Sequence, residues 1–183
     1  RPEVVINIVD ASNLERNLYL AVQFLEMGIP VCIALNMIDV AKKRGIEINA
    51  SKLSNLLGVP VVPTIARTGQ GKTELMDSAA RIVKENTKFV PLKISYGDDV
   101  ESALIEMEKK IETGNFLTDT YPARWIALKY MESDDQILEK GQNANPDLDT
   151  GLRKQVKKVS QHLQDTLDTY PEAMIADQRY GYI

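Results

Sequence analysis

The segment Asn36-Met37-Ile38-Asp39 places an amide and a carboxylate three residues apart, directly after an apolar run at residues 31–35. Guanine presents two adjacent donors, N1–H and N2–H, and one carboxylate can accept both of them. Adenine has an acceptor at N1 and no 2-amino group, so it would leave this carboxylate unpaired. We therefore expect Asp39 to select guanine, while Asn36 braces the loop and faces the purine N7.

A second segment, Ile65-Ala66-Arg67, follows another apolar run and is expected to form the opposite wall of the site. A backbone N–H near Ala66 would donate to guanine O6, a contact for which the identity of the side chain matters little. The Asn-x-x-Asp spacing is also typical of an ordinary turn at the end of a strand, because Asn and Asp are common turn formers. From these residues alone, both interpretations stay open.

The stretch from Ala66 to Thr73 supports a competing hypothesis, because only its first residue departs from the phosphate-loop pattern Gly-x-x-x-x-Gly-Lys-Ser/Thr. Lys72 would then reach the phosphates and Thr73 would hold Mg²⁺. Asp98 or Asp99 would supply a second metal carboxylate, and the protein would be an ATPase. This alternative leaves the Asn-x-x-Asp pair without a role, and a simple loop with an exposed lysine at a helix start explains the same residues.

The elements that must position these residues alternate along the first half of the chain. Apolar runs of strand length occur at residues 4–9, 31–35 and 59–62, and stripes with helical spacing follow each of them. This order predicts right-handed crossovers and a parallel sheet with helices packed on it. Ligands bind at the carboxyl ends of such strands, where both candidate segments lie. The run at 4–9 is nearly continuous, so we expect a strand covered on both faces.

The second half of the chain is predicted to be a helical module. Apolar stripes of helical spacing include Trp125, which we expect to be a core residue. Thr150 is predicted to cap a long helix, and Pro171 suits the first turn of a last helix. Residues 141–149 contain Asn, Pro and Asp and are predicted to form a loop. The predicted organisation is therefore an α/β part at residues 1–86 and an all-α part at residues 87–183.

Composition restricts the partners. The net charge is −4, hydrophobic residues make up 44% and charged residues 26%, values typical of a folded globular chain. The acidic excess lies in the second half, which argues against nucleic-acid binding and against adsorption to anionic membranes. Cys32 is the only cysteine and His162 the only histidine, so we expect neither a disulfide framework nor a zinc site. Because Cys32 lies inside an apolar run, we expect it to be buried and unreactive.

The stretch INIVDASNLERNLYLAVQFLEMGIPVCIALNMIDVAKKRGIEINASKLSNLLGVPVVPTIARTGQG closely resembles the G domain of FeoB-type ferrous-iron transporters. The later segments ARWIALKYME and ADQRYGYI resemble the helical module of the same family. The resemblance implies that residues 1–86 are the C-terminal half of a P-loop-GTPase-like G domain, a partial parallel sheet with flanking helices. It implies that residues 87–183 are a helical regulatory module that inhibits nucleotide dissociation, as a guanine-nucleotide dissociation inhibitor (GDI) does.

The resemblance also assigns roles to the candidate residues. It implies that Asn36-Met37-Ile38-Asp39 is the guanine-specificity motif, with Met37 where many GTPases have lysine. It implies that Ile65-Ala66-Arg67 is the second base-contacting loop, in which Ile65 departs from the usual serine. Loss of that hydroxyl is expected to weaken nucleotide affinity without changing the choice of base.

The expected function follows from the same resemblance. The parent would bind and hydrolyse GTP and thereby control Fe(II) uptake through a membrane-embedded iron-permeation domain of the same polypeptide, with this part on the cytoplasmic side of a prokaryotic membrane. The phosphate loop, the switch segments and the ligands of Mg²⁺ would precede Arg1, so the chain alone is expected to be inactive. A non-enzymatic helical adaptor is a further alternative, and homo-oligomerisation through exposed apolar surface near residues 4–9 stays open.

Overall fold

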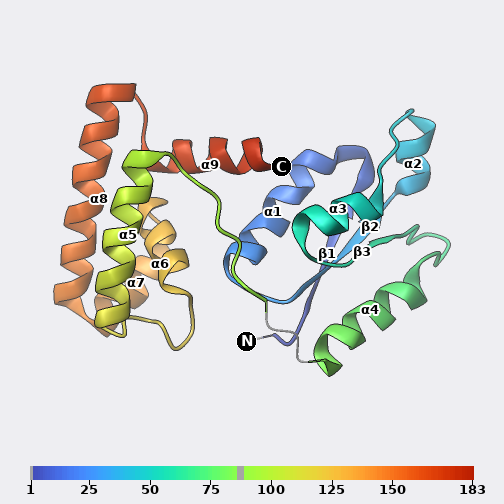
Figure 1. Ribbon diagram of the computed structural model, residues 1–183, viewed down its shortest axis with the longest axis horizontal. Helices are drawn as coiled ribbons and strands as arrows, with labels where there is room; N and C mark the ends of the chain where they lie inside the picture. The colour runs from blue at the N-terminus through green and yellow to red at the C-terminus, as the bar shows by residue number, and fades with distance from the viewer. Residues whose placement is uncertain (1, 86–88) are drawn as a thin grey trace. The chain divides into compact units, whose positions relative to one another are not determined.

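A computed structural model describes residues 2–85 and 89–183 and divides the chain into two compact units, one ending at Leu92 and the other spanning Lys93–Tyr182 (Figure 1). The first unit is α/β and the second is helical, which confirms the predicted fold class. The elements of the first unit are β1 (Val5–Asp10), α1 (Leu14–Glu26), β2 (Val31–Asn36), α2 (Ile38–Lys43), α3 (Ala50–Leu57), β3 (Val61–Pro63) and α4 (Lys72–Lys84).

The three strands form a parallel sheet in the order β1-β2-β3. The register pairs Asp10 with Asn36 and Leu35 with Pro63, so the carboxyl ends of all three strands meet at one edge. Parallel pairing follows from the helical crossovers between the strands, since a short hairpin cannot join parallel neighbours. The two candidate segments, which follow β2 and β3, therefore leave the sheet at neighbouring positions of this edge.

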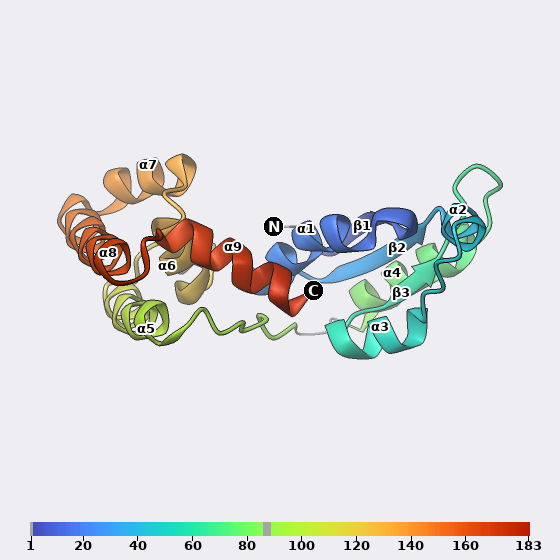
Figure 2. The same ribbon diagram turned by 90° about the horizontal axis from the view of Figure 1, so that it is seen from above.

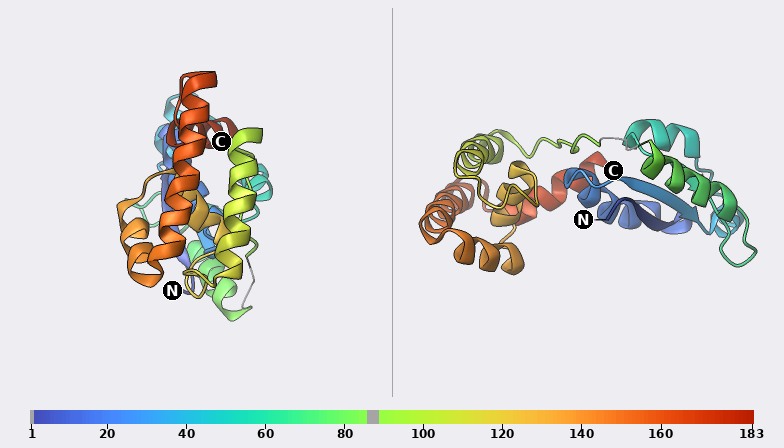
Figure 3. Two further views of the ribbon diagram at one scale, coloured as in Figure 1. Left: turned by 90° about the vertical axis from the view of Figure 1, so that its left-hand side faces the viewer. Right: turned by 90° about the horizontal axis from the view of Figure 1, so that it is seen from below.

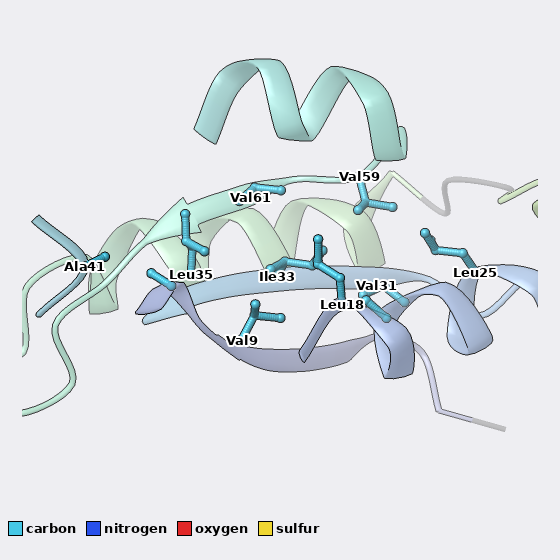
Figure 4. Close-up of a cluster of buried hydrophobic side chains, with 11 residues drawn as sticks. Val9, Leu18, Leu25, Val31, Ile33, Leu35, Ala41, Val59 and Val61 are labelled. Carbon is cyan, nitrogen blue, oxygen red and sulfur yellow. The ribbon is translucent and has the colours of Figure 1, made fainter. Parts of the chain in front are cut away.

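Two apolar layers cover the sheet because successive side chains of a strand point to opposite faces. On one face Val31, Ile33 and Leu35 pack with α1 and α3 (Figure 4). On the other face Cys32 packs with Val62 and with Ile82 of α4. Burial raises the pKa of the Cys32 thiol, in accord with the prediction of a buried and unreactive cysteine.

The prediction that the first strand is covered on both faces is wrong. Val9 is fully buried, but Ile8 on the opposite face is 68% exposed. The helix on that face, α4, packs mainly against β2, and β1 is an edge strand of the described sheet. Ile6 is half-buried for the same reason.

Helix α2 was not predicted, because a six-residue helix offers too few apolar positions to show a period. Two apolar residues in the helical stripes of the neighbouring helices are also exposed, Leu56 in α3 by 65% and Met76 in α4 by 53%. Both apolar stripes are therefore narrower than their sequences indicate.

The second unit contains α5 (Asp98–Thr113), α6 (Ala123–Met131), α7 (Asp135–Ala144), α8 (Pro146–Leu167) and α9 (Pro171–Tyr182). Helices α5 and α8 lie side by side (Figure 3), and α7 lies beside α8 (Figure 2). Trp125 is buried at 8% exposure, as predicted for a core residue, and Pro171 begins α9 as predicted. Over the described residues, no helix is long and apolar enough to cross a membrane.

The predicted loop at residues 141–149 and the predicted cap at Thr150 are both wrong. Helix α7 continues to Ala144 and α8 begins at Pro146, with Asn145 as the single break. The Oδ1 atom of Asn145 accepts a hydrogen bond from the N–H of Leu148 at 3.1 Å and caps α8. Thr150 lies inside the helix, where its hydroxyl donates to the carbonyl of Pro146 at 2.8 Å.

A hydrogen-bonded cluster of Tyr130, Asp149 and Arg153 lies where α6, α7 and α8 meet. The Tyr130 hydroxyl donates to Oδ1 of Asp149 at 2.6 Å, and Nε of Arg153 donates to Oδ2 of the same carboxylate at 2.8 Å. Gly141 of α7 faces this hydroxyl, since a Cβ built there would lie 2.0 Å from it. The glycine is therefore required by packing rather than by a turn.

Candidate functional site

Asn36, the last residue of β2, connects the two candidate segments. Its Oδ1 atom accepts a hydrogen bond from the backbone N–H of Ala66 at 3.0 Å. The hydroxyl of Thr64 approaches the same oxygen at 3.5 Å. Since both neighbours are donors, the network assigns Oδ1 to this side of the amide. The loop after β2 is thereby fixed to the loop after β3.

The other amide atom of Asn36, Nδ2, makes no hydrogen bond with any residue in the ranges 2–85 and 89–183. An amide nitrogen carries two donors. Asn36 can therefore hold the loops together through Oδ1 and still donate to an acceptor such as purine N7.

Met37 turns the chain from β2 into α2. Its φ of 61° lies in the left-handed region, which is uncommon for a residue other than glycine. Its carbonyl accepts from the N–H groups of Val40 and Ala41, both at 3.0 Å, so the helix starts at once. Ile38 packs against the core beside the sheet and holds the start of α2 in place.

Asp39 lies in the first turn of α2 and is half-buried. Its carboxylate forms no hydrogen bond or ion pair with the described part of the chain. Both oxygens are thus available to accept from two adjacent donors, such as those on the edge of a guanine.

Residues 64–71 form a closed loop. The N–H of Ile65 donates to the carbonyl of Gln70 at 3.1 Å, and the carbonyl of Ile65 accepts from Thr68 at 3.0 Å and from Gly69 at 3.1 Å. Ala66 and Arg67 lie exposed at the tip. The loop is therefore held by its own backbone and presents Ala66 toward Asn36.

This geometry argues against the phosphate-loop alternative. A phosphate cradle directs its backbone N–H groups at the ligand. Here the N–H groups of Thr68, Gly69 and Lys72 donate to carbonyls within the loop, the last at 3.2 Å to Gly69. Lys72 is exposed and has no ion pair within the described ranges. The segment fits a simple loop at a helix start.

The structure changes one detail of the predicted base contact. A backbone N–H near Ala66 was expected to donate to guanine O6, and the N–H of Ala66 itself donates to Asn36. Donation to O6 would require the N–H to exchange one acceptor for the other.

A hollow of about 220 Å³ lies on the α4 side of the sheet below this edge. Asn36 and Ala66 line it, together with apolar side chains of β1 and β2 such as Ile8. Asp39 does not line it. The structure thus brings Asn36 and Ala66 together and places Asp39 on α2, outside the hollow.

Thr64 was not predicted as a site residue, although it is 5% exposed and its hydroxyl faces Asn36. A signal was present: Leu35 pairs with Pro63, so the residues that follow them lie at the same level of the sheet. To know that Thr64 lies beside Asn36, one needs the register between β2 and β3, and local sequence patterns do not supply that register.

Two family models match the chain. The model described as ferrous iron transport protein B matches residues 1–79, and the model described as FeoB cytosolic helical domain matches residues 96–183. The chain is 42% identical over 190 residues to an Fe(2+) transport protein A/Fe(2+) transporter FeoB fusion protein of Porphyromonas gingivalis, covering 100% of this chain and 22% of the relative. It is 37% identical to an Fe(2+) transporter FeoB of Staphylococcus aureus, covering 94% of this chain and 26% of that protein.

Solved structures with the same fold come from two further sources. An S. thermophilus NFeoB variant bound to GDP matches with a TM-score of 0.81 and 34% identity, covering 100% of this chain and 67% of that chain. The cytosolic domain of a T. maritima FeoB iron transporter in apo form matches with a TM-score of 0.73 and 28% identity, covering 100% and 65%. The chain thus spans about a quarter of the curated relatives and about two thirds of the solved fragments.

Proposed function

The chain belongs to the FeoB family of ferrous iron transport proteins, and we propose that its first unit is the guanine-recognising half of a G domain. One observation carries this proposal. Asn36 binds Ala66 through Oδ1 at 3.0 Å and so joins two loops at the carboxyl edge of the sheet, where ligands of parallel sheets bind.

In the proposed complex three groups recognise the base. The carboxylate of Asp39 accepts N1–H and N2–H, and its lack of a protein partner in the described ranges supports this role. The Nδ2 atom of Asn36 donates to N7. The N–H of Ala66 donates to O6 after exchange from Asn36. Met37 and Ile38 place the carboxylate, while Ile65 and Arg67 flank the donor.

The similar solved structures support guanine as the base, since S. thermophilus NFeoB variants are described as bound to GDP and to GMPPNP. We extend this property to the present chain as a proposal. The identity of 34% and the shared fold make conservation of the binding edge the simplest expectation.

The proposal assigns the phosphate and Mg²⁺ sites to residues outside this chain. Among the described residues no group of three or more His, Cys, Asp or Glu could hold a metal ion, and the loop at residues 64–71 has no free row of N–H groups. In the proposed parent another part of the G domain supplies both sites. The same part would cover Ile6 and the 68% exposed Ile8 on the outer face of β1.

For the whole protein we propose that the nucleotide state controls passage of Fe(II) through a membrane-embedded domain of the same polypeptide. The second unit, Lys93–Tyr182, would be the regulatory helical module that connects the two and slows nucleotide release. The G domain would then lie on the cytoplasmic side of the membrane. The names of the relatives as Fe(2+) transporters support this role.

Nucleotide competition on the full-length protein tests the proposal. A fluorescent GDP analogue is displaced with GTP, ITP or ATP in the presence of Mg²⁺. We expect GTP to compete best, ITP less well because it lacks the 2-amino group, and ATP at least about a hundredfold less well. Equal competition by GTP and ATP would contradict the guanine site.

A further inference from the structure

Gly71 lies where the loop at residues 64–71 enters α4, and a side chain has no room there. Its φ is +78°, and a Cβ built on it would lie 2.2 Å from the carbonyl oxygen of Pro63 and 3.0 Å from Cγ2 of Thr64. A distance of 2.2 Å to a backbone oxygen cannot be relieved by a change of rotamer. The start of α4 therefore approaches the end of β3 more closely than any other residue type would allow.

Gly69, two residues earlier in the same loop, provides a comparison. Its φ is +76°, nearly the same as that of Gly71, but a Cβ built there meets no atom within 4 Å. Alanine would impose a similar backbone strain at both positions. Only at Gly71 would it also push against β3.

The contact at Gly71 closes the loop that carries Ala66. The loop leaves the sheet at Pro63 and returns to it at Gly71, so these two residues define its base. Above the base, Thr64 and Ala66 both reach Oδ1 of Asn36. A displacement of Gly71 from Pro63 would therefore tilt the loop and move the N–H of Ala66 relative to Asn36.

We propose that Gly71 is a positioning residue of the guanine site: by lying against the Pro63 carbonyl, it sets the height at which the Ala66 N–H meets guanine O6. The inference rests on the proposed function, in which that N–H donates to O6. It adds a residue that touches no nucleotide and acts only through the loop.

The test compares Gly71→Ala with Gly69→Ala in the full-length protein, using GDP and 6-thio-GDP as probes. Sulfur at position 6 accepts a hydrogen bond more weakly than oxygen, whereas N1–H and N2–H remain for Asp39. A change in the ratio of the two dissociation constants between variants thus reports a change at position 6 of the base. A purely structural defect would weaken both nucleotides equally and leave this ratio unchanged.

We expect the unmodified protein and Gly69→Ala to prefer GDP by about tenfold, the value of one good hydrogen bond. Gly71→Ala is expected to reduce this preference to about twofold and to speed GDP dissociation. Circular dichroism and thermal unfolding confirm that each variant is folded.

A milder variant covers the case in which Gly71→Ala does not fold. Thr64→Ser keeps the hydroxyl that faces Asn36 but removes Cγ2, the atom that would lie 3.0 Å from a Cβ on Gly71. It loosens the packing beside the loop base and is expected to reduce the same preference by a smaller factor. Preferences equal to that of Gly69→Ala in both variants would overturn the positioning role alone. An unmodified protein that does not prefer GDP over ADP would overturn the proposed function and this inference with it.

Discussion

The Oδ1 atom of Asn36 accepts a hydrogen bond from the backbone N–H of Ala66 at 3.0 Å, across 30 positions of sequence. This bond joins the loop that follows β2 to the loop that follows β3. A single amide therefore determines whether the two segments proposed to contact the base stay in register with each other.

Replacement of Asn36 by alanine removes the acceptor of this bond and the proposed donor to N7. We expect guanine-nucleotide affinity in the full-length protein to fall at least about tenfold, since each lost partner typically costs about 1 kcal/mol. Isothermal titration calorimetry with GDP measures the change. Asn55→Ala, at an exposed position of α3, is the matched control and should bind as the unmodified protein does. Equal affinities of the two variants would refute the bracing role.

Replacement of Lys72 by alanine separates the guanine site from the phosphate-loop alternative. Lys72 is exposed and unpaired within the described ranges, so we expect nucleotide affinity to change by no more than about twofold. The same displacement measurement with GTP and ATP reports the effect. A loss of a hundredfold or more would instead favour an ATPase that uses this lysine on the phosphates.

Replacement of Ile65 by serine adds a hydroxyl to the loop that carries Ala66, at the position where the resemblance to GTPases leads us to expect serine. The new hydroxyl is expected to brace the loop and to slow GDP dissociation by roughly two- to tenfold, the range of one net hydrogen bond. Base preference should not change, because the proposed base contacts are made by Asp39, Asn36 and the N–H of Ala66 and not by the side chain at position 65. Stopped-flow release of a fluorescent GDP analogue measures the rate, and a faster release than in the unmodified protein would count against the assignment.

Replacement of Tyr130 by phenylalanine tests the buried hydrogen bond between Tyr130 and Asp149 in the second unit. The hydroxyl is lost and Oδ1 of Asp149 is left without its donor, while Arg153 still binds Oδ2. We expect the free energy of unfolding at pH 7 to fall by about 1–3 kcal/mol. Urea unfolding of the chain, followed by circular dichroism, measures this difference.

The pH dependence of the same variant gives an independent check. Burial, and then the hydrogen bond to Asp149, raise the pKa of Tyr130 above its ordinary value of 10. The folded chain keeps this proton at pH values where the unfolded chain loses it, so its contribution to stability is complete below pH 10 and declines above it. The phenylalanine variant should lose less stability between about pH 9 and 11. Identical slopes for both proteins would show that the hydroxyl does not titrate as described.

The position of the candidate site could be predicted because it depends on local patterns. Apolar runs that alternate with helical stripes indicate a parallel sheet, and the polar residues after each run then lie at its carboxyl edge. Asn36 and Ala66 meet there as the predicted order of elements requires. The hydrogen bond from the Ala66 N–H to Asn36 could not be predicted, since it depends on atomic distances across two loops.

The errors in the second unit have a different cause. Asn145 and Pro146 are common both in turns and at the starts of helices, so composition does not distinguish the two. Gly141 is compatible with a loop by type, yet it lies in α7, where the Tyr130 hydroxyl fills the space that a side chain would need. A local side-chain cap starts α8 at Asn145, and packing against the distant Tyr130 explains Gly141. Periodicity of apolar residues along one segment contains neither piece of information.

The choice of base by Asp39 is the central claim, and exchange of its carboxylate tests it most directly. Xanthine carries an oxygen where guanine carries the 2-amino group, so an amide at position 39 can donate to the oxygen that a carboxylate would repel. In the full-length protein we predict that Asp39→Asn prefers XDP over GDP by about tenfold or more, whereas the unmodified protein and the exposed control Asp77→Asn prefer GDP. An Asp39→Asn protein that still prefers GDP over XDP would contradict the account.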